Sequence, residues 1–247
     1  MPHRRGAAAR AEANGGMAWK AAAWAWLYAC ALCLTAPAHA ETPFEREVLA
    51  AVNFARTDPA GYADALERYK RYFHGNIVSL PGQSVDFETS EGVRVVDETI
   101  MFLRRQRPMA PIAPAALLRE SASDHSSEQG ASGAIGHEGA DGSSPGDRVR
   151  RHGGGAYVAE VIAYGSLDAV DAVRQLIVDD GVDDRGHRAI LYSPELAYAG
   201  VSCGPHKDYR IVCVMDLGIT PDGRLPATTR QAAVHRASPA RTDAPPA

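Results

Sequence analysis

A histidine that follows a run of acidic residues is the strongest chemical feature of this sequence. His187 comes after an acid- and glycine-rich stretch containing Asp179, Asp180, Asp183 and Asp184, and apolar residues flank the stretch on both sides. Imidazole is the side chain most able to change charge or bind a metal ion near neutral pH. Stretches rich in Asp and Gly are more often solvated turns. The chemistry of His187 therefore depends on which other residues the fold brings to it.

Two other segments carry residues that could join His187. His137 lies in the glycine- and serine-rich segment 132–155, which is too long for a plain connection, and long ordered loops within domains tend to be functional. Glu160 stands between Val158 and Ile162 on one face of a predicted strand. A carboxylate on an inward face needs a partner or a proton. Both residues are therefore candidates for a shared site.

Imidazole and carboxylate groups together suit zinc or a similar divalent cation, or a general base. The predicted site comprises His137, Glu160 and His187, with an acid from Asp180, Asp183 or Asp184. The spacing between these residues matches no short metal-binding motif, so the fold must bring them together.

Two other hypotheses remain open at this stage. One is nucleophilic catalysis by a serine with one of the histidines, and the candidates are Ser126, Ser127 and Ser193. No G-x-S-x-G motif supports this hypothesis. The other is a binding module without chemistry, in which the polar groups only hold loops together.

The first forty residues have the pattern of a secretory signal peptide. Basic residues up to Lys20 precede a mostly apolar run over 21–34, and the triplet Ala38-His39-Ala40 follows. The apolar run is shorter than the roughly 20 residues that a membrane-spanning helix needs, and no later segment is long and apolar enough. We predict cleavage after Ala40, no transmembrane segment after cleavage, and a secreted or periplasmic protein.

Removal of this leader changes the charge and the cysteine content. Subtracting four basic residues from 26 and one acidic residue from 30 leaves a net charge of about −7. An acidic chain without a basic stripe argues against nucleic acid or an anionic membrane surface as a partner. Cys203 and Cys213 are the two cysteines that remain. An oxidising compartment favours a disulfide between them, although the register of their strands cannot be read from the sequence.

The order of predicted elements indicates an α+β fold, with helices packed on a small antiparallel sheet. Helices are expected over 44–56, 59–73, 93–105, 117–129 and 167–178, and strands over 157–165, 198–203 and 209–217. Ser166 is the expected N-cap of the last helix, and segments 74–89 and 132–155 are expected to be loops. Asn53 and Arg56 are interpreted as a helix cap and a surface pair. One domain is predicted over 41–222, and a disordered tail over 223–247.

Seven short motifs in order give this chain a resemblance to a known family. They are V-N-F-A-R (52–56), Gly136-His137, Arg148 before a glycine run, A-E-V-I-A-Y-G (159–165), R-G-H-R (185–188), G-V-S-C-G (200–204) and C-V-M-D-L-G (213–218). Together they resemble the CAP superfamily, which includes cysteine-rich secretory proteins, antigen 5 and pathogenesis-related 1 proteins, and is also known by its SCP domain. The resemblance extends over residues 44–218 and is closest to bacterial single-domain members. It implies an α-β-α sandwich with a cleft built around two histidines and two acids.

The resemblance also assigns roles to particular residues. His137 resembles the first histidine of the family's cleft, Glu160 its first acid and His187 its second histidine. The second glutamate of the family falls where this chain has Gln175, Asp179 and Asp180, and Asp180 is the predicted substitute, with a shorter side chain.

The functions associated with the family are divalent metal in the cleft, binding of sterols or other lipids, and proteolysis. A shared fold does not transfer a function. We expect an exported binding module at the cell envelope, with an unidentified protein or lipid partner and with zinc or another divalent cation held through His137 and His187. One alternative is a metal-assisted hydrolase with Glu160 as general base. Another is a lipid-binding protein with a groove between the first helix and the helix over 93–105.

Overall fold

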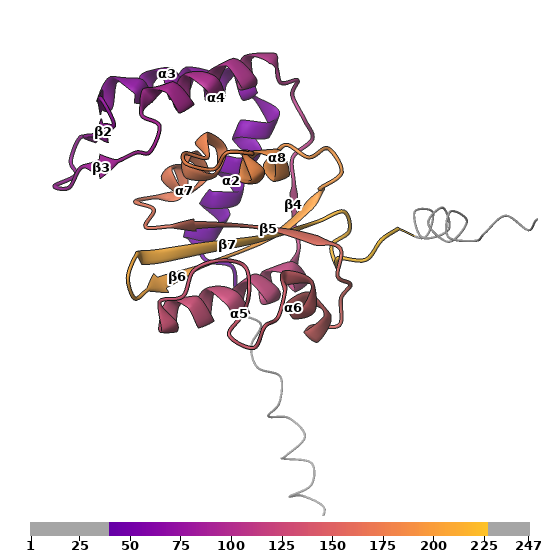
Figure 1. Cartoon of the computed structure of the whole chain (residues 1–247). Coiled ribbons are helices and arrows are strands. Elements are labelled where there is room, and N and C mark those ends of the chain that lie inside the picture. Colours follow the sequence, from indigo (N-terminus) through magenta and orange to yellow (C-terminus); the bar gives the residue numbers. More distant parts are fainter. Residues whose placement is uncertain (1–39, 227–247) are drawn as a thin grey trace, which may run out of the picture. The chain divides into compact units, whose positions relative to one another are not determined.

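A four-stranded sheet forms the centre of the computed structural model, which describes residues 40–226 (Figure 1). Strands β5 (Val158–Tyr164), β6 (Tyr198–His206) and β7 (Arg210–Gly218) are antiparallel, with β7 in the middle. The short strand β4 (Ala113–Pro114) pairs with the other side of β6 in parallel. Strand β4 was not predicted from the sequence, because a two-residue strand that includes a proline shows no alternation.

Helices cover both faces of this sheet (Figure 1). One face carries α2 (Pro43–Thr57), α7 (Ala169–Val178) and α8 (Gly186–Leu191), and the other carries α5 (Ala116–Ser132) and α6 (Pro145–Arg151). The predicted α+β class and the α-β-α sandwich are confirmed.

A further group of elements lies beyond the first helical layer. It consists of α3 (Pro59–Tyr69), the 3-10 helix η2 (Lys70–Tyr72), α4 (Val93–Arg105) and a small antiparallel sheet of β1 (Phe73–His74), β2 (Ile77–Val78) and β3 (Phe87–Glu88). Helices α3 and α4 pack against each other (Figure 1). The loop predicted over 74–89 therefore contains β2 and β3, which the sequence did not reveal because strands of two residues show no periodicity.

The alternation of side chains along β5 places Glu160 on the face that α5 covers. Val161 and Ala163 belong to the large apolar core on the opposite face, whereas Ile162 packs with Ala122 of α5. Since neighbouring residues of a strand point to opposite faces, Glu160 lies on the same side as Ile162.

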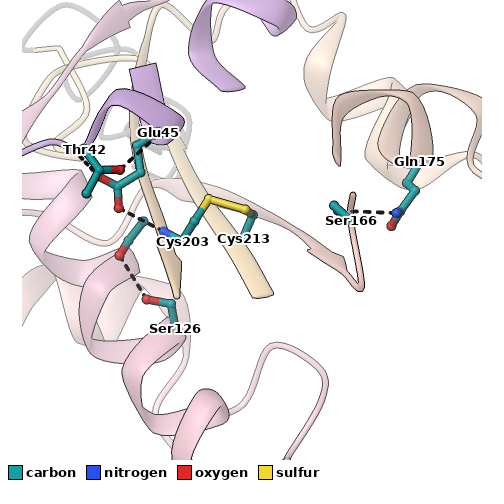
Figure 2. The surroundings of a disulfide bond; sticks show 8 residues. Thr42, Glu45, Ser126, Ser166, Gln175, Cys203 and Cys213 are labelled. Carbon is teal, nitrogen blue, oxygen red and sulfur yellow. Dashed lines mark hydrogen bonds between the residues drawn. A yellow bond between two sulfur atoms is a disulfide. The ribbon is translucent and has the colours of Figure 1, made fainter. Parts of the chain in front are cut away.

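Local caps set the ends of the helices near the site. Asp168, not Ser166, is the N-cap of α7, and its carboxylate accepts a hydrogen bond from the backbone N–H of Asp171. The hydroxyl of Ser166 instead accepts a hydrogen bond from Gln175 (Figure 2). The expected loop over 132–155 contains α6, whose start is fixed by a capping box between Ser144 and Asp147.

Cys203 and Cys213 form a disulfide between β6 and β7 (Figure 2). The two residues are direct partners in the register of these strands, and their Cα atoms are 4.1 Å apart. The favoured pairing is therefore confirmed. The backbone N–H of Cys203 also donates a hydrogen bond to Glu45, which links the first turn of α2 to β6 (Figure 2).

Arg56 differs from the expected surface residue, because it is 2% exposed. Its guanidinium donates hydrogen bonds to the backbone carbonyls of Ala110, Leu191, Ser193 and Leu196. The carbonyls belong to two segments that are far apart in the sequence, so Arg56 joins the end of α2 to both. The V-N-F-A-R motif is therefore structural in this chain.

The predicted ends of the chain fall largely beyond the described part. Residues 1–39 of the predicted leader and residues 227–247 of the predicted tail lie outside it. Gly223 and Arg224, at the start of that predicted tail, hydrogen-bond with Tyr157 and Gly153. Across residues 40–226, the helices are too short or too polar to cross a lipid bilayer.

Replacing Arg56→Met should lower the free energy of unfolding by roughly 3 kcal/mol or more, because several buried carbonyls lose their donor. Urea denaturation would measure the change. The matched control is Arg46→Met in the same helix, where an exposed arginine contacts one carbonyl, and a change within about 0.5 kcal/mol is expected there. Equal effects of the two substitutions would contradict the structural role of Arg56.

Candidate functional site

His137 is held by a buried carboxylate of the central sheet. The Nδ1 atom of His137 lies 2.8 Å from Oε1 of Glu160, whose side chain is 1% exposed. Because a carboxylate is an acceptor, this contact places the proton of a neutral imidazole on Nδ1 and leaves Nε2 with a free lone pair. Glu160 therefore fixes both the orientation and the tautomer of His137.

Arg148 of α6 holds both His137 and Glu160 through its guanidinium. Its side chain is fully buried, and Nη2 donates to Oε2 of Glu160 at 2.5 Å. Nη1 donates to the backbone carbonyls of His137 and Ser143 at 3.1 and 3.0 Å. One guanidinium thus neutralises the buried carboxylate and fastens the loop that carries His137 to the sheet.

A second acid lies beside Glu160 on the neighbouring strand. Asp216 is fully buried on β7 and is the register partner of Glu160 on β5. Burial and the neighbouring Glu160 carboxylate raise the pKa of Asp216 well above its usual range. The protonated form of Asp216 is favoured as a result, so that the charge of Arg148 remains available to Glu160.

His187 is held by a different carboxylate at the junction of two helices. Its Nδ1 lies 2.6 Å from Oδ1 of Asp179, which is the C-cap of α7 with a positive φ of 59°. The other carboxylate oxygen, Oδ2, accepts hydrogen bonds from the backbone N–H groups of His187 and Arg188 in the first turn of α8. Asp179 therefore closes one helix, caps the next and orients the imidazole.

Asp179 also affects the protonation of His187. The hydrogen bond to its carboxylate raises the pKa of His187 above the usual value of 6.5, and burial opposes this rise only in part. The nearby charges of Asp179 and Asp184 act in the same direction as the hydrogen bond.

The two histidines face each other across a short gap. Their ring centroids are 6.4 Å apart, and their side chains are 52% exposed for His137 and 26% exposed for His187. Among the described residues, no hydrogen bond involves Nε2 of either ring. The structure thus brings together His137, Glu160 and His187, as the sequence analysis predicted from segments far apart in the chain.

The predicted fourth residue, Asp180, lies elsewhere. Its carboxylate accepts hydrogen bonds from the backbone N–H groups of Ser90 and Glu91, at 2.6 and 2.9 Å, and holds the segment before α4. The acid beside His187 is Asp179 instead. The left-handed backbone at Asp179 turns the chain, so the two consecutive side chains serve different partners. The sequence signal for this role is weak: an aspartate occupies a helix C-cap position where glycine is usual.

Arg185 and the buried Arg188 hold α8 in place. Neither role was predicted from the sequence. Arg185 forms ion pairs with Glu91 and Glu98, at 2.7 Å each. Arg188 donates to Glu98 and to the carbonyls at the end of α7. The contact with Arg185 lowers the pKa of Glu91 to about 2. The R-G-H-R motif therefore supplies two arginines, one on each side of His187 in the sequence, that fix α8 to its neighbours.

The serine hypothesis gains no support from the geometry. Ser126 is buried and hydrogen-bonds to the hydroxyl of Ser202 and to the carbonyl of Ser123, rather than to a histidine.

By their chemistry, the two free ring nitrogens could serve as ligands of a metal ion, whereas the four-residue set that the sequence suggested does not assemble. Within residues 40–226, no group of three His, Cys, Asp or Glu side chains is placed to hold an ion. Glu160 and Asp179 instead bind the Nδ1 atoms. Histidines that coordinate metals commonly donate their other ring N–H to a carboxylate, as both of these do. The remaining coordination positions would come from outside these side chains.

Comparison with known proteins is consistent with this geometry. Residues 98–217 match the model of the cysteine-rich secretory protein family, CAP. This part of the chain belongs to the CAP family. The matched part of this CAP domain includes both histidines, both carboxylates that hold them, and Arg148. The resemblance on which the roles of His137, Glu160 and His187 were assigned is thereby confirmed.

Two solved structures are similar to parts of the CAP domain. One is an extracellular protein with an SCP domain from Bacillus anthracis, with 21% identity and a TM-score of 0.38, over 50% of this chain and 38% of that protein. The other is an outer surface protein of Borrelia burgdorferi, with 15% identity and a TM-score of 0.37, over 44% of this chain and 77% of that protein. This chain thus spans well under half of the Bacillus protein. The comparison with curated proteins gives no significant match.

The raised pKa of His187 predicts a pH dependence of stability. Because the folded pKa lies above the unfolded value, protonated His187 stabilises the fold; the contribution is complete below about pH 6.5 and is lost as the pH rises through the folded pKa. The difference in unfolding free energy between the native chain and His187→Gln should therefore shrink from pH 6 to pH 8 in the presence of a chelator. Denaturation at several pH values would measure it.

The matched control for this prediction is His74→Gln, at an exposed position. An NMR titration of His187 in the Asp179→Asn variant gives a second test, since loss of the carboxylate should lower the pKa of His187. An unchanged pKa in that variant would rule out Asp179 as the cause of the shift.

Proposed function

We propose that this chain is an exported CAP domain that acts as a binding module, and that His137 and His187 together coordinate a divalent cation such as zinc. The observation that carries the proposal is the pair of imidazoles that face each other, each with Nδ1 on a buried carboxylate and with Nε2 free among the described contacts. A carboxylate partner fixes the ring and raises its basicity as a ligand.

Two features support export of the protein. The first forty residues have the order of a secretory leader. The disulfide between Cys203 and Cys213 is of a kind that persists in oxidising compartments and is rare in the cytosol of mesophiles. Both features support the proposal of a secreted or periplasmic location.

A cation at this position would supply a Lewis acid with open coordination positions. His137 and His187 would hold it, and Glu160, Asp179 and Arg148 would keep the two rings in place. Since both rings are partly exposed, an oxygen or nitrogen atom of a binding partner at the cell envelope could complete the coordination. This is how the cleft would serve recognition.

The contacts of Glu160 favour a binding role over a metal-assisted hydrolase. A general base must reach the proton that it removes. Both oxygens of Glu160 are engaged, one by His137 and the other by Arg148, and its side chain is almost fully buried. The alternative of a lipid groove is likewise unsupported, because Val96, Ile100 and Leu103 of α4 belong to the buried core.

Calorimetric titration of the chelator-treated protein with zinc tests the proposal. The native protein should bind about one equivalent, and a His137→Ala/His187→Ala variant should lose this binding, because it lacks both nitrogen ligands. The control is a His74→Ala/His152→Ala variant, which removes the same number of imidazoles from outside the cleft and should bind like the native protein.

Absorption spectra with cobalt(II) add a second readout, because the visible bands of this ion report its ligands and geometry. Bands that depend on His137 and His187 support the proposal. Equal zinc binding by all three proteins, or none in the native protein, would mean that the histidines serve only as hydrogen-bonding groups.

A further inference from the structure

A cavity of about 450 Å³ lies apart from the histidine pair. Its walls come from the end of α3, the region of β1 and β3, helix α7, the end of β5 and the turn between β6 and β7. None of the four residues of the histidine–carboxylate pairs lines it. Its volume is within the range of sites for small organic molecules.

Aromatic side chains make up a third of the residues that line this cavity. Five of them line it: Tyr69, Phe73, Phe87, Tyr164 and Tyr209. Two pairs are in contact, with ring centroids 5.2 Å apart for Tyr69 and Phe73 and 5.5 Å apart for Tyr164 and Tyr209. Aromatic faces carry partial negative charge and attract cations.

The charged residues of the cavity add to this preference. Glu88, Asp171 and Asp180 carry three negative charges, and Arg174 is the one lysine or arginine among the lining residues. Its guanidinium is already committed, because it pairs with Asp171 and stacks on the ring of Tyr69 at 4.2 Å from the centroid. The lining therefore has a net charge of −2, and one of its aromatic rings already holds a cation.

We propose that this cavity binds an organic cation, an amine or a quaternary ammonium group with apolar substituents. The aromatic walls would contact the substituents and the cationic centre, while the net negative charge would favour a cation over a neutral molecule of the same shape. An anionic amphiphile fits less well, because the guanidinium that could receive its head group is neutralised by Asp171. This proposal does not depend on metal binding by the histidines.

An NMR titration of the full protein with three probes tests the proposal. Choline is the cation, 3,3-dimethylbutan-1-ol is a neutral molecule of nearly the same shape, and phosphocholine adds an anionic group. Choline should shift the amide signals of the lining residues Thr89 and Gly165 saturably and bind about three- to tenfold more tightly than the neutral alcohol. Phosphocholine should bind more weakly than choline, because of the acidic lining.

Two substitutions locate the site. Phe87→Leu and Tyr209→Leu keep an apolar side chain but remove an aromatic face, and each should weaken choline binding about two- to fivefold. The control is Tyr157→Leu, an exposed tyrosine outside the cavity, which should leave the affinity unchanged. The amide spectrum of each variant reports whether the fold is intact.

Four results would overturn the proposal. Equal affinity for choline and the neutral alcohol would show a merely apolar cavity. Tighter binding of phosphocholine would identify a phospholipid head group as the occupant. Absence of saturable shifts with choline, or no effect of either substitution in a folded variant, would exclude the cavity as the site.

Discussion

The buried ion pair between Arg148 and Glu160 is the interaction on which the cleft depends. Two charges that have left water must neutralise each other, and loss of either partner leaves the other uncompensated, at a cost of roughly 3–5 kcal/mol. The same guanidinium holds the backbone of the loop at His137 and Ser143. A change at this pair would therefore act on the sheet, on the loop and on the position of His137 together. The raised pKa of the neighbouring Asp216 favours its neutral form, which limits competition for the charge of Arg148.

Different elements hold the two histidines, but through the same kind of contact, which joins Nδ1 to a buried carboxylate. His137 depends on a strand and on an arginine from α6, whereas His187 depends on the end of α7 and the start of α8. In each case Nδ1 contacts a nearly inaccessible carboxylate, and the imidazole itself is partly exposed. The geometry of the pair is thus set by rigid elements rather than by the loops alone, which suits a site that must be formed before its ligand arrives.

Much of this arrangement could be predicted from residue types and order. The helices over 44–56 and 93–105 have clear apolar periods, and the placement of Glu160 among apolar residues indicated a paired carboxylate. The choice between Asp179 and Asp180 could not be made, because it depends on one backbone angle that no local pattern reveals. The role of Arg56 was missed for a related reason: its four carbonyl partners come from segments that only the folded chain brings near.

At Asp179, the residue type that best fits the left-handed backbone differs from the one that orients His187. Glycine adopts a positive φ at almost no steric cost, and aspartate does so less readily. Asp179→Gly would ease the backbone but abolish the carboxylate that orients His187 and caps α8. Under selection for heat resistance alone, glycine at this position would be opposed by the loss of the cap on α8 and by the loss of the contact between Asp179 and His187. In a protein that no longer needed an oriented His187, glycine at position 179 would be an early substitution, and the fold would remain intact.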